Sequence, residues 1–151
     1  MSKREILLKA LAATPQDLAR IGRSVDETAV SIRPLPDQWS VADVLSHLYR
    51  VEERYLARLQ RVVEEERPFL PGIYPDETTH DLTLSFAALL DQFTQARTAT
   101  LTYLHGLKAG EWQRSAIHSE WGEVKFRTLV QHLVEHDTAH LNQLIEINSK
   151  L

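Results

Sequence analysis

Apolar residues recur at helical spacing over four stretches of the chain. The second stretch is the clearest, because Ser40 is placed to cap a helix there. The apolar residues that follow it are Val41, Val44, Leu45, Leu48, Val51, Tyr55, Leu59 and Val62. Recurrence at i, i+3, i+4 and i+7 places such residues on one face of an α-helix. The pattern therefore predicts a helix from Val41 to about residue 64.

The first stretch is predicted to hold two segments. Thr14, Pro15 and Asp17 resemble a helix start, because Thr is a good N-cap, Pro suits the first helical position and an acid three residues after the cap completes the pattern. We expect a helix from there through Ile32, ended by Pro34. A shorter segment, residues 3–13, precedes it.

The third and fourth stretches each predict one long helix. Asp81 is expected to open the third helix, which ends at Gly106. The fourth is expected to run from Phe126 to Leu151, although Lys125 is a poor N-cap. Residues 107–124 are irregular, and a short hairpin is one interpretation of them.

These four amphipathic helices predict an all-α four-helix bundle, because each has a polar face and must bury its apolar one. Residues 65–80 contain three Pro and no periodicity, so they form a long crossover between the second and third helices, of a kind that often covers a site. One long connection implies a topology other than simple up-and-down. The length of 151 residues suits a single domain, residues 1–151.

Charge and composition narrow the classes of partner. The net charge of −4 offers no basic face, so nucleic acid is not expected, and the Arg-rich run from Arg50 to Arg61 is interpreted as a solvated helix flank. No apolar run approaches the roughly 20 residues of a membrane span, so no membrane partner is expected. The absence of Cys and of a convincing secretory signal indicates a cytoplasmic protein.

Three histidines, His132, His136 and His140, recur every four residues on the last helix. Neighbours at i and i+4 lie about 5 to 6 Å apart, close enough for two imidazoles to reach one ion. Spacing of four drifts by about 40° each time, so one of the three must be left out. The apolar stripe contains His140, has His136 at its edge and turns His132 toward solvent. We therefore expect His136 and His140 to point inward, with three surface histidines as the alternative.

Two acids are predicted to be buried beside these histidines. The helical wheel places Asp137 within the apolar stripe of the last helix and Glu52 within that of the second, where His47 lies at the margin. A buried acid needs a cation, a donor or a metal site. The pattern indicates a polar site inside the bundle, or pairing with an Arg such as Arg97.

Two known kinds of metal site fit poorly. The segment from His136 to His140 looks like a zincin helix with Asp as the base, but only eleven residues follow, which leaves no room for a downstream ligand. A di-iron carboxylate bundle needs inward Glu-x-x-His pairs on two helices, and the only such spacing, Glu77 to His80, lies in the crossover.

The segment Trp39-Ser40 before a helix with His47, together with HDTAHLNQ from His136 to Gln143, resembles the DinB/YfiT-like superfamily of metalloenzymes. The resemblance covers nearly the whole chain. It implies an up-down-down-up bundle, a homodimer, and one divalent metal ion bound by His47, His136 and His140. Gln143 matches a recurrent Gln on the same face, whereas Ala139 departs from a common Arg or His.

Three neutral imidazoles would leave an open coordination position, as in catalytic sites. Since related enzymes use thiols, the leading hypothesis is a metal-dependent transferase that acts with a low-molecular-weight thiol on a small molecule. Glu52 or Asp137 would orient a ligand or handle protons. A metal-dependent hydrolase and a non-enzymatic, stress-related dimeric metal-binding protein are the alternatives. Imidazole ligands suit Zn, Ni or Fe.

Two further expectations concern the surface. The mouth of the site is expected to be lined by His118, Trp121 and Tyr74, with His118 contacting the substrate. The alternative is that Trp112 and Trp121 cap the core and His118 faces water. Apolar residues in the crossover, Phe69, Leu70, Ile73 and Tyr74, support a dimer interface.

Overall fold

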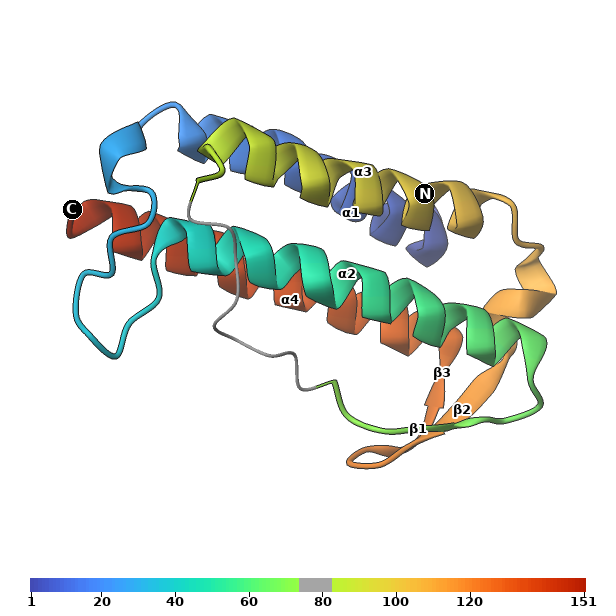
Figure 1. Ribbon diagram of the computed structural model, residues 1–151. Coiled ribbons are helices and arrows are strands. Elements are labelled where there is room, and N and C mark those ends of the chain that lie inside the picture. Colours follow the sequence, from blue (N-terminus) through green and yellow to red (C-terminus); the bar gives the residue numbers. More distant parts are fainter. Residues whose placement is uncertain (74–82) are drawn as a thin grey trace.

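The computed structural model describes residues 1–73 and 83–151 and contains four long helices (Figure 1). They are α1 (Lys3–Gly22), α2 (Val41–Glu64), α3 (Phe86–His105) and α4 (Phe126–Ser149). In Figure 1, α1 and α4 run in one direction and α2 and α3 in the other. Each helix packs against two neighbours, so that α1 and α2 lie across one diagonal and α3 and α4 across the other. The predicted four-helix bundle with up-down-down-up topology is confirmed.

The helices α2 and α4 begin where their sequence predicted. At the start of α2, the Ser40 hydroxyl accepts the Asp43 N–H at 3.0 Å and the Asp43 carboxylate accepts the Ser40 N–H at 2.8 Å, a reciprocal cap. Lys125 makes no side-chain cap at the start of α4. The N–H of Phe126 instead donates to the carbonyl of Arg114 at 2.8 Å, so the preceding segment supplies the partner.

The predicted helix start at Thr14 is wrong. The helix α1 runs without a break through this residue and holds Pro15 in its interior. Pro has no N–H to donate to the carbonyl four residues earlier, which here belongs to Leu11. The buried Arg97 donates to that carbonyl at 2.8 Å. A tertiary hydrogen bond therefore replaces the helical one that Pro15 removes.

The first helix also ends at Gly22, well before the predicted end near Ile32. The ring of Phe86, the first residue of α3, packs so closely on Gly22 that a β-carbon there would collide with it. The chain then leaves the helix and forms a connection that includes the short 3₁₀ helix Glu27–Ala29. The end of α1 therefore coincides with close packing against the start of α3, a tertiary contact that the apolar periodicity does not reveal.

Ser85 caps α3 by accepting the N–H of Ala88 at 3.1 Å. The predicted start of this helix at Asp81 lies outside the described residues. The same holds for the other crossover residues that the sequence singled out, Tyr74, Glu77 and His80.

A small sheet lies beside α2 and α4, near one end of the bundle (Figure 1). It contains β1 (Phe69–Leu70), β2 (Ser115–His118) and β3 (Gly122–Lys125), in the order β1-β2-β3. The antiparallel pair β2 and β3 is the short hairpin that residues 107–124 allowed. The parallel pairing of β1 with β2 was not predicted, and it ties the crossover to the hairpin (Figure 1).

The interior consists of two apolar clusters with a polar layer between them. Along α1, Leu11 belongs to one cluster and Leu18 to the other, with Thr14 between them. Along α3, Leu104 and Phe93 are divided in the same way, with Arg97 between them. The remaining members of this layer are Glu52 of α2 and Asp137 of α4, both buried. All four helices thus contribute a polar residue at the middle of the bundle.

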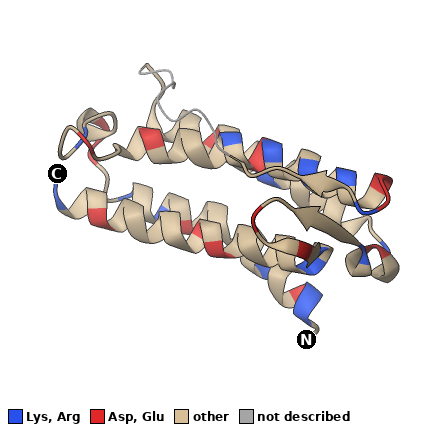
Figure 2. Cartoon of the chain, turned by 90° about the horizontal axis from the view of Figure 1, so that it is seen from below, with Lys and Arg blue, Asp and Glu red and all other residues tan. Residues whose placement is uncertain are grey.

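Charged residues of both signs are interspersed over the helices, and Lys and Arg recur along α2 among Asp and Glu (Figure 2). Within residues 1–73 and 83–151, no helix is both long and apolar enough to cross a membrane.

Candidate metal centre

The histidines of α2 and α4 converge through their Nε2 atoms. Nε2 of His136 lies 3.0 Å from Nε2 of His47 and 3.1 Å from Nε2 of His140. Ligand nitrogens bound tetrahedrally to one ion at 2.0 to 2.1 Å stand about 3.3 Å apart, so a small expansion would admit an ion. In the described part of the chain, no other group of three or more metal-ligating side chains is this close. The donor set fits one divalent ion.

His132 lies outside this cluster. Its ring stacks on Trp121, with centroids 4.2 Å apart, and its Nδ1 lies 3.4 Å from a carboxylate oxygen of Glu135. The third histidine of the i+4 series is therefore engaged elsewhere, as the drift along the helix predicts.

The environment keeps the three converging rings neutral. Burial lowers the pKa of His47 to about 3 and that of His136 to about 4, and repulsion between the rings adds to both shifts. Burial also lowers the pKa of His140. Each neutral ring has one nitrogen with a free lone pair, which is the form that binds a metal.

Gln143 orients one of the rings. Its side-chain oxygen lies 2.7 Å from Nδ1 of His140. An amide oxygen only accepts, so the proton of His140 resides on Nδ1 and the lone pair on Nε2 faces the other rings. Nδ1 of His47 and Nδ1 of His136 have no such partner among the described residues. The tautomer is therefore determined most directly at His140.

We expect Gln143→Leu to weaken metal binding by about 10- to 100-fold, because His140 would lose the acceptor that fixes its tautomer. Competition with a chromophoric chelator measures the affinity. Gln131→Leu, an exposed position on the same helix, is the matched control and should bind as the parent does. Equal affinities of the two variants would contradict the orienting role of Gln143.

Metal-free protein is expected to lose stability as the pH falls from about 6.5 toward 4. The pKa values of His47 and His136 are about 3 and about 4 in the folded protein, against about 6.5 for an unfolded chain. Within that window the unfolded state binds more protons, so the free energy of unfolding rises with pH and is lost as the pH falls. Urea unfolding with chelator at pH 7 and pH 5 measures this. If the double variant His47→Ala/His136→Ala shows as large a difference as the parent, these rings are not its source.

Arg97 joins the two buried acids. Its Nε and Nη2 donate to Glu52 at 2.8 and 2.9 Å, and its Nη1 and Nη2 donate to Asp137 at 2.8 and 2.9 Å. The bond to Leu11 uses the fifth N–H, so every donor of this fully buried guanidinium is paired. Thr14 adds a bond of 2.6 Å from its hydroxyl to Asp137. Burial alone would lower the pKa of Arg97, but the two carboxylates raise it above its usual value.

The structure thus gives Glu52 and Asp137 the Arg97 partner that the sequence left open as an alternative. Within the described residues, the side-chain hydrogen bonds of these two acids go to Arg97 and Thr14 and not to a histidine ring. A direct catalytic role for either acid stays a prediction.

Two cavities reach the histidine cluster from different sides. One, of about 420 Å³, is bounded by His47 and His136 together with His118, Trp121 and Arg58. The other, of about 400 Å³, is bounded by His140, Gln143, Trp39, Asp37, Gln38, Glu146, Ile147 and Lys150. The cluster is therefore accessible to small molecules.

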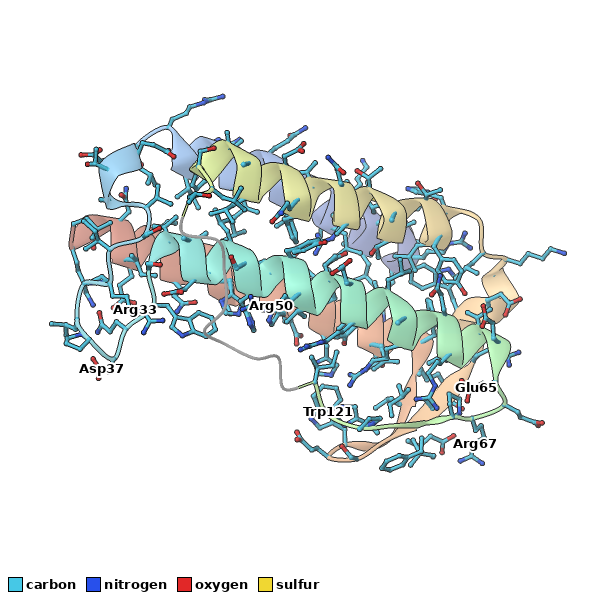
Figure 3. The ribbon with its side chains drawn as sticks, viewed as in Figure 1. Arg33, Asp37, Arg50, Glu65, Arg67 and Trp121 are labelled. Carbon is cyan, nitrogen blue, oxygen red and sulfur yellow. The ribbon has the colours of Figure 1, made fainter. Side chains whose placement is uncertain are left out.

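His118 lies in the wall of the first cavity, as expected. Its Nδ1 accepts the backbone N–H groups of Glu120 and Trp121 at 3.0 and 3.3 Å, and its ring stacks on Trp121 with centroids 3.8 Å apart. Trp121 extends from the turn between β2 and β3 (Figure 3). His118 is buried and does not face water, whereas Trp112 packs in the core against Phe126.

Arg58 is the residue of this cavity that the sequence interpretation missed. The sequence interpretation places Arg58 on a solvated helix flank, but the residue is only 7% exposed. The signal was present, because Arg58 follows Val51 and Tyr55 at spacings of seven and three, which places it on the apolar face of α2.

Comparison with known proteins identifies one family and one fold. The model of the DinB superfamily matches residues 10–144. No curated protein matches the chain. Among solved structures, YfiT from Bacillus subtilis, described as a probable metal-dependent hydrolase with an unusual four-helix bundle topology, has a TM-score of 0.79 and 17% identity, covering 97% of this chain and 87% of that one.

Two further structures share the fold. TT2238, a four-helix bundle protein, has a TM-score of 0.70 and 20% identity over 95% of this chain and 98% of its own. A mycothiol-dependent maleylpyruvate isomerase has a TM-score of 0.67 and 12% identity over 95% of this chain and 61% of its own. At these identities the likeness concerns the fold alone.

Proposed function

The chain belongs to the DinB superfamily, and from this membership we propose that it is a metal-dependent enzyme. His47, His136 and His140 would hold one divalent ion, Zn, Ni or Fe. The observation that carries the proposal is the convergence of three neutral Nε2 atoms within hydrogen-bond distance. An ion held there supplies a Lewis acid with an open position, which lowers the pKa of a thiol or water.

The reaction that we propose is transfer involving a low-molecular-weight thiol and a small molecule. Two observations support it. The two cavities beside the histidines provide room for two partners on different sides of the cluster. The fold is shared with a mycothiol-dependent isomerase. In this arrangement the N–H on Nε2 of His118 is available to a substrate, because Nδ1 already accepts two backbone N–H groups.

Metal-dependent hydrolysis is the second candidate, and the similarity to YfiT favours it. A purely structural ion that fastens α2 to α4 is disfavoured, because His47, His136 and His140 all border cavities. A site that only joined two helices would gain nothing from such access.

Metal analysis of protein purified without chelator or nickel resin is the first test, followed by two activity screens. One screen offers mycothiol or bacillithiol with an electrophilic chloronitrobenzene, and the other offers nitrophenyl esters without thiol. We expect turnover that needs both metal and thiol. Ester cleavage without thiol would support the hydrolase instead. Stoichiometric metal with no activity in either screen would count for the non-enzymatic alternative.

We also propose that the protein is a homodimer, although fewer crossover residues are exposed than the sequence indicates. Phe69 is 59% exposed, but Leu70 is buried at 1% and Ile73 packs partly against the core. The described residues of the crossover therefore do not form the continuous apolar patch that the sequence indicates. A dimeric mass by light scattering at micromolar concentration is expected.

A further inference from the structure

Arg58 is a buried cation in the wall of the cavity that also contains His47 and His136. It extends from the third turn after His47 on α2, and its Nη2 donates to the carbonyl of Pro71 in the crossover. Its guanidinium carbon lies 5.4 Å from the ring centroid of Tyr55. The guanidinium is thus held between α2 and the crossover at the edge of the cavity.

The partners of Arg58 are neutral, in contrast to those of Arg97. No carboxylate oxygen of the described residues forms an ion pair with Arg58 within 4.0 Å, whereas Arg97 binds two carboxylates at 2.8 to 2.9 Å. Burial accordingly lowers the pKa of Arg58 and is opposed only in part by Tyr55. Burial of a guanidinium among neutral partners is costly, and a bound anion would offset part of that cost.

The other charged groups at this cavity do not supply that anion. Glu135 is exposed and lies beside His132, and Glu120 is exposed on the hairpin and attracts Arg58 only at longer range. Neither carboxylate forms an ion pair with the guanidinium of Arg58. Arg58 and His118 therefore bring donors to this cavity without a carboxylate ion-paired to Arg58.

His118 adds a neutral donor to this position. Its Nδ1 accepts two backbone N–H groups, so the neutral ring carries its proton on Nε2. The ring is held by stacking on Trp121, which itself stacks on His132. Stacked aromatic rings beside a guanidinium suit a ligand that has both an apolar part and an anionic group.

We propose that this cavity binds the anionic group of a small substrate, a carboxylate or a phosphate, through the guanidinium of Arg58 and the Nε2–H of His118. The apolar part of the substrate lies against Trp121. That the bound molecule is a substrate rests on the proposed function. The binding of its anionic group needs no metal. An anionic group bound there would place the rest of the substrate in the same cavity as His47 and His136.

The test uses benzoate, phenyl phosphate and the neutral benzamide as probes of the full chain, with and without metal. Binding is followed by the shift of the Trp121 indole N–H resonance, assigned with Trp121→Phe. We expect at least one anion to bind about tenfold or more tighter than benzamide in both metal states, since a hydrogen bond to a charged group is worth about that factor. Whichever of benzoate and phenyl phosphate binds more tightly shows whether the cavity prefers a carboxylate or a phosphate.

Arg58→Gln should abolish the preference for anions, and His118→Ala should reduce it. Arg61→Gln, which changes a partly exposed neighbour paired with Glu65, is the matched control and should keep the preference. Should Arg58→Gln fail to fold, Arg58→Lys, which keeps the charge but loses the planar fork, should retain part of the preference. Anions that bind no tighter than benzamide would overturn the proposal, and so would an anion preference seen only with metal. Binding by the metal-free protein does not depend on catalysis. A failure of the anion site can therefore be told apart from a failure of the proposed function.

Discussion

His136→Ala should lower bound metal from about one ion per chain to background. Nε2 of His136 is the central atom of the cluster, at 3.0 Å from one partner and 3.1 Å from the other. Without it, two imidazoles on different helices remain, and three protein ligands are the usual minimum for a catalytic zinc site. Mass spectrometry of metals after dialysis measures the content. His47→Ala and His140→Ala should give the same result.

His132→Ala is the matched control for these variants. It removes an imidazole from the same helix, one turn before His136, but its ring stacks on Trp121 outside the cluster. We expect parental metal content. Helical circular dichroism should be unchanged in all four variants, since none alters a cap. Parental metal in a folded His136→Ala variant would show that the ligand assignment is wrong.

Arg97→Met should destabilise the protein by about 3 to 5 kcal/mol, the usual cost of removing one partner from a buried ion pair. The reason is that Glu52 and Asp137 would remain buried at 1% and 3% exposure without a cation. The carbonyl of Leu11 would also lose its donor, because Pro15 has no N–H that could replace that of Arg97. Urea unfolding at pH 7 measures the change in the free energy of unfolding.

Two comparison variants separate this network from ordinary surface pairing. Arg20→Met breaks an exposed pair with Asp17 and should cost less than about 1 kcal/mol. The triple variant Arg97→Met/Glu52→Leu/Asp137→Leu removes all three charges and should recover most of the loss, because apolar replacement of a buried ion network is often neutral. A cost for Arg97→Met as small as that for Arg20→Met would rule out the proposed role in stability.

Local sequence determined the parts of this protein that depend on neighbours within a few turns. The start of α2 follows from the reciprocal cap of Ser40 and Asp43. The pairing of His136 with His140 follows from helix geometry, since residues four apart lie on one face. The same geometry excluded His132 from the cluster. These predictions hold because each interaction is made inside a single helix.

The tertiary structure decided which distant groups meet. Thr14 and Pro15 have the local pattern of a helix start, yet Thr14 binds Asp137, 123 residues away, and Pro15 leaves a carbonyl free for Arg97. A packed interior satisfied these groups better than a helix end would have done.

The site shows the same division. Periodicity showed that Glu52 and Asp137 are buried, but only the packing of four helices selected Arg97 as their common partner. Likewise, Arg58 and His118 are 60 residues apart in sequence, and the crossover and hairpin bring them to one cavity. The physical reason is that burial is set by the period of one helix, whereas the choice of partner depends on how all the helices and the small sheet pack together.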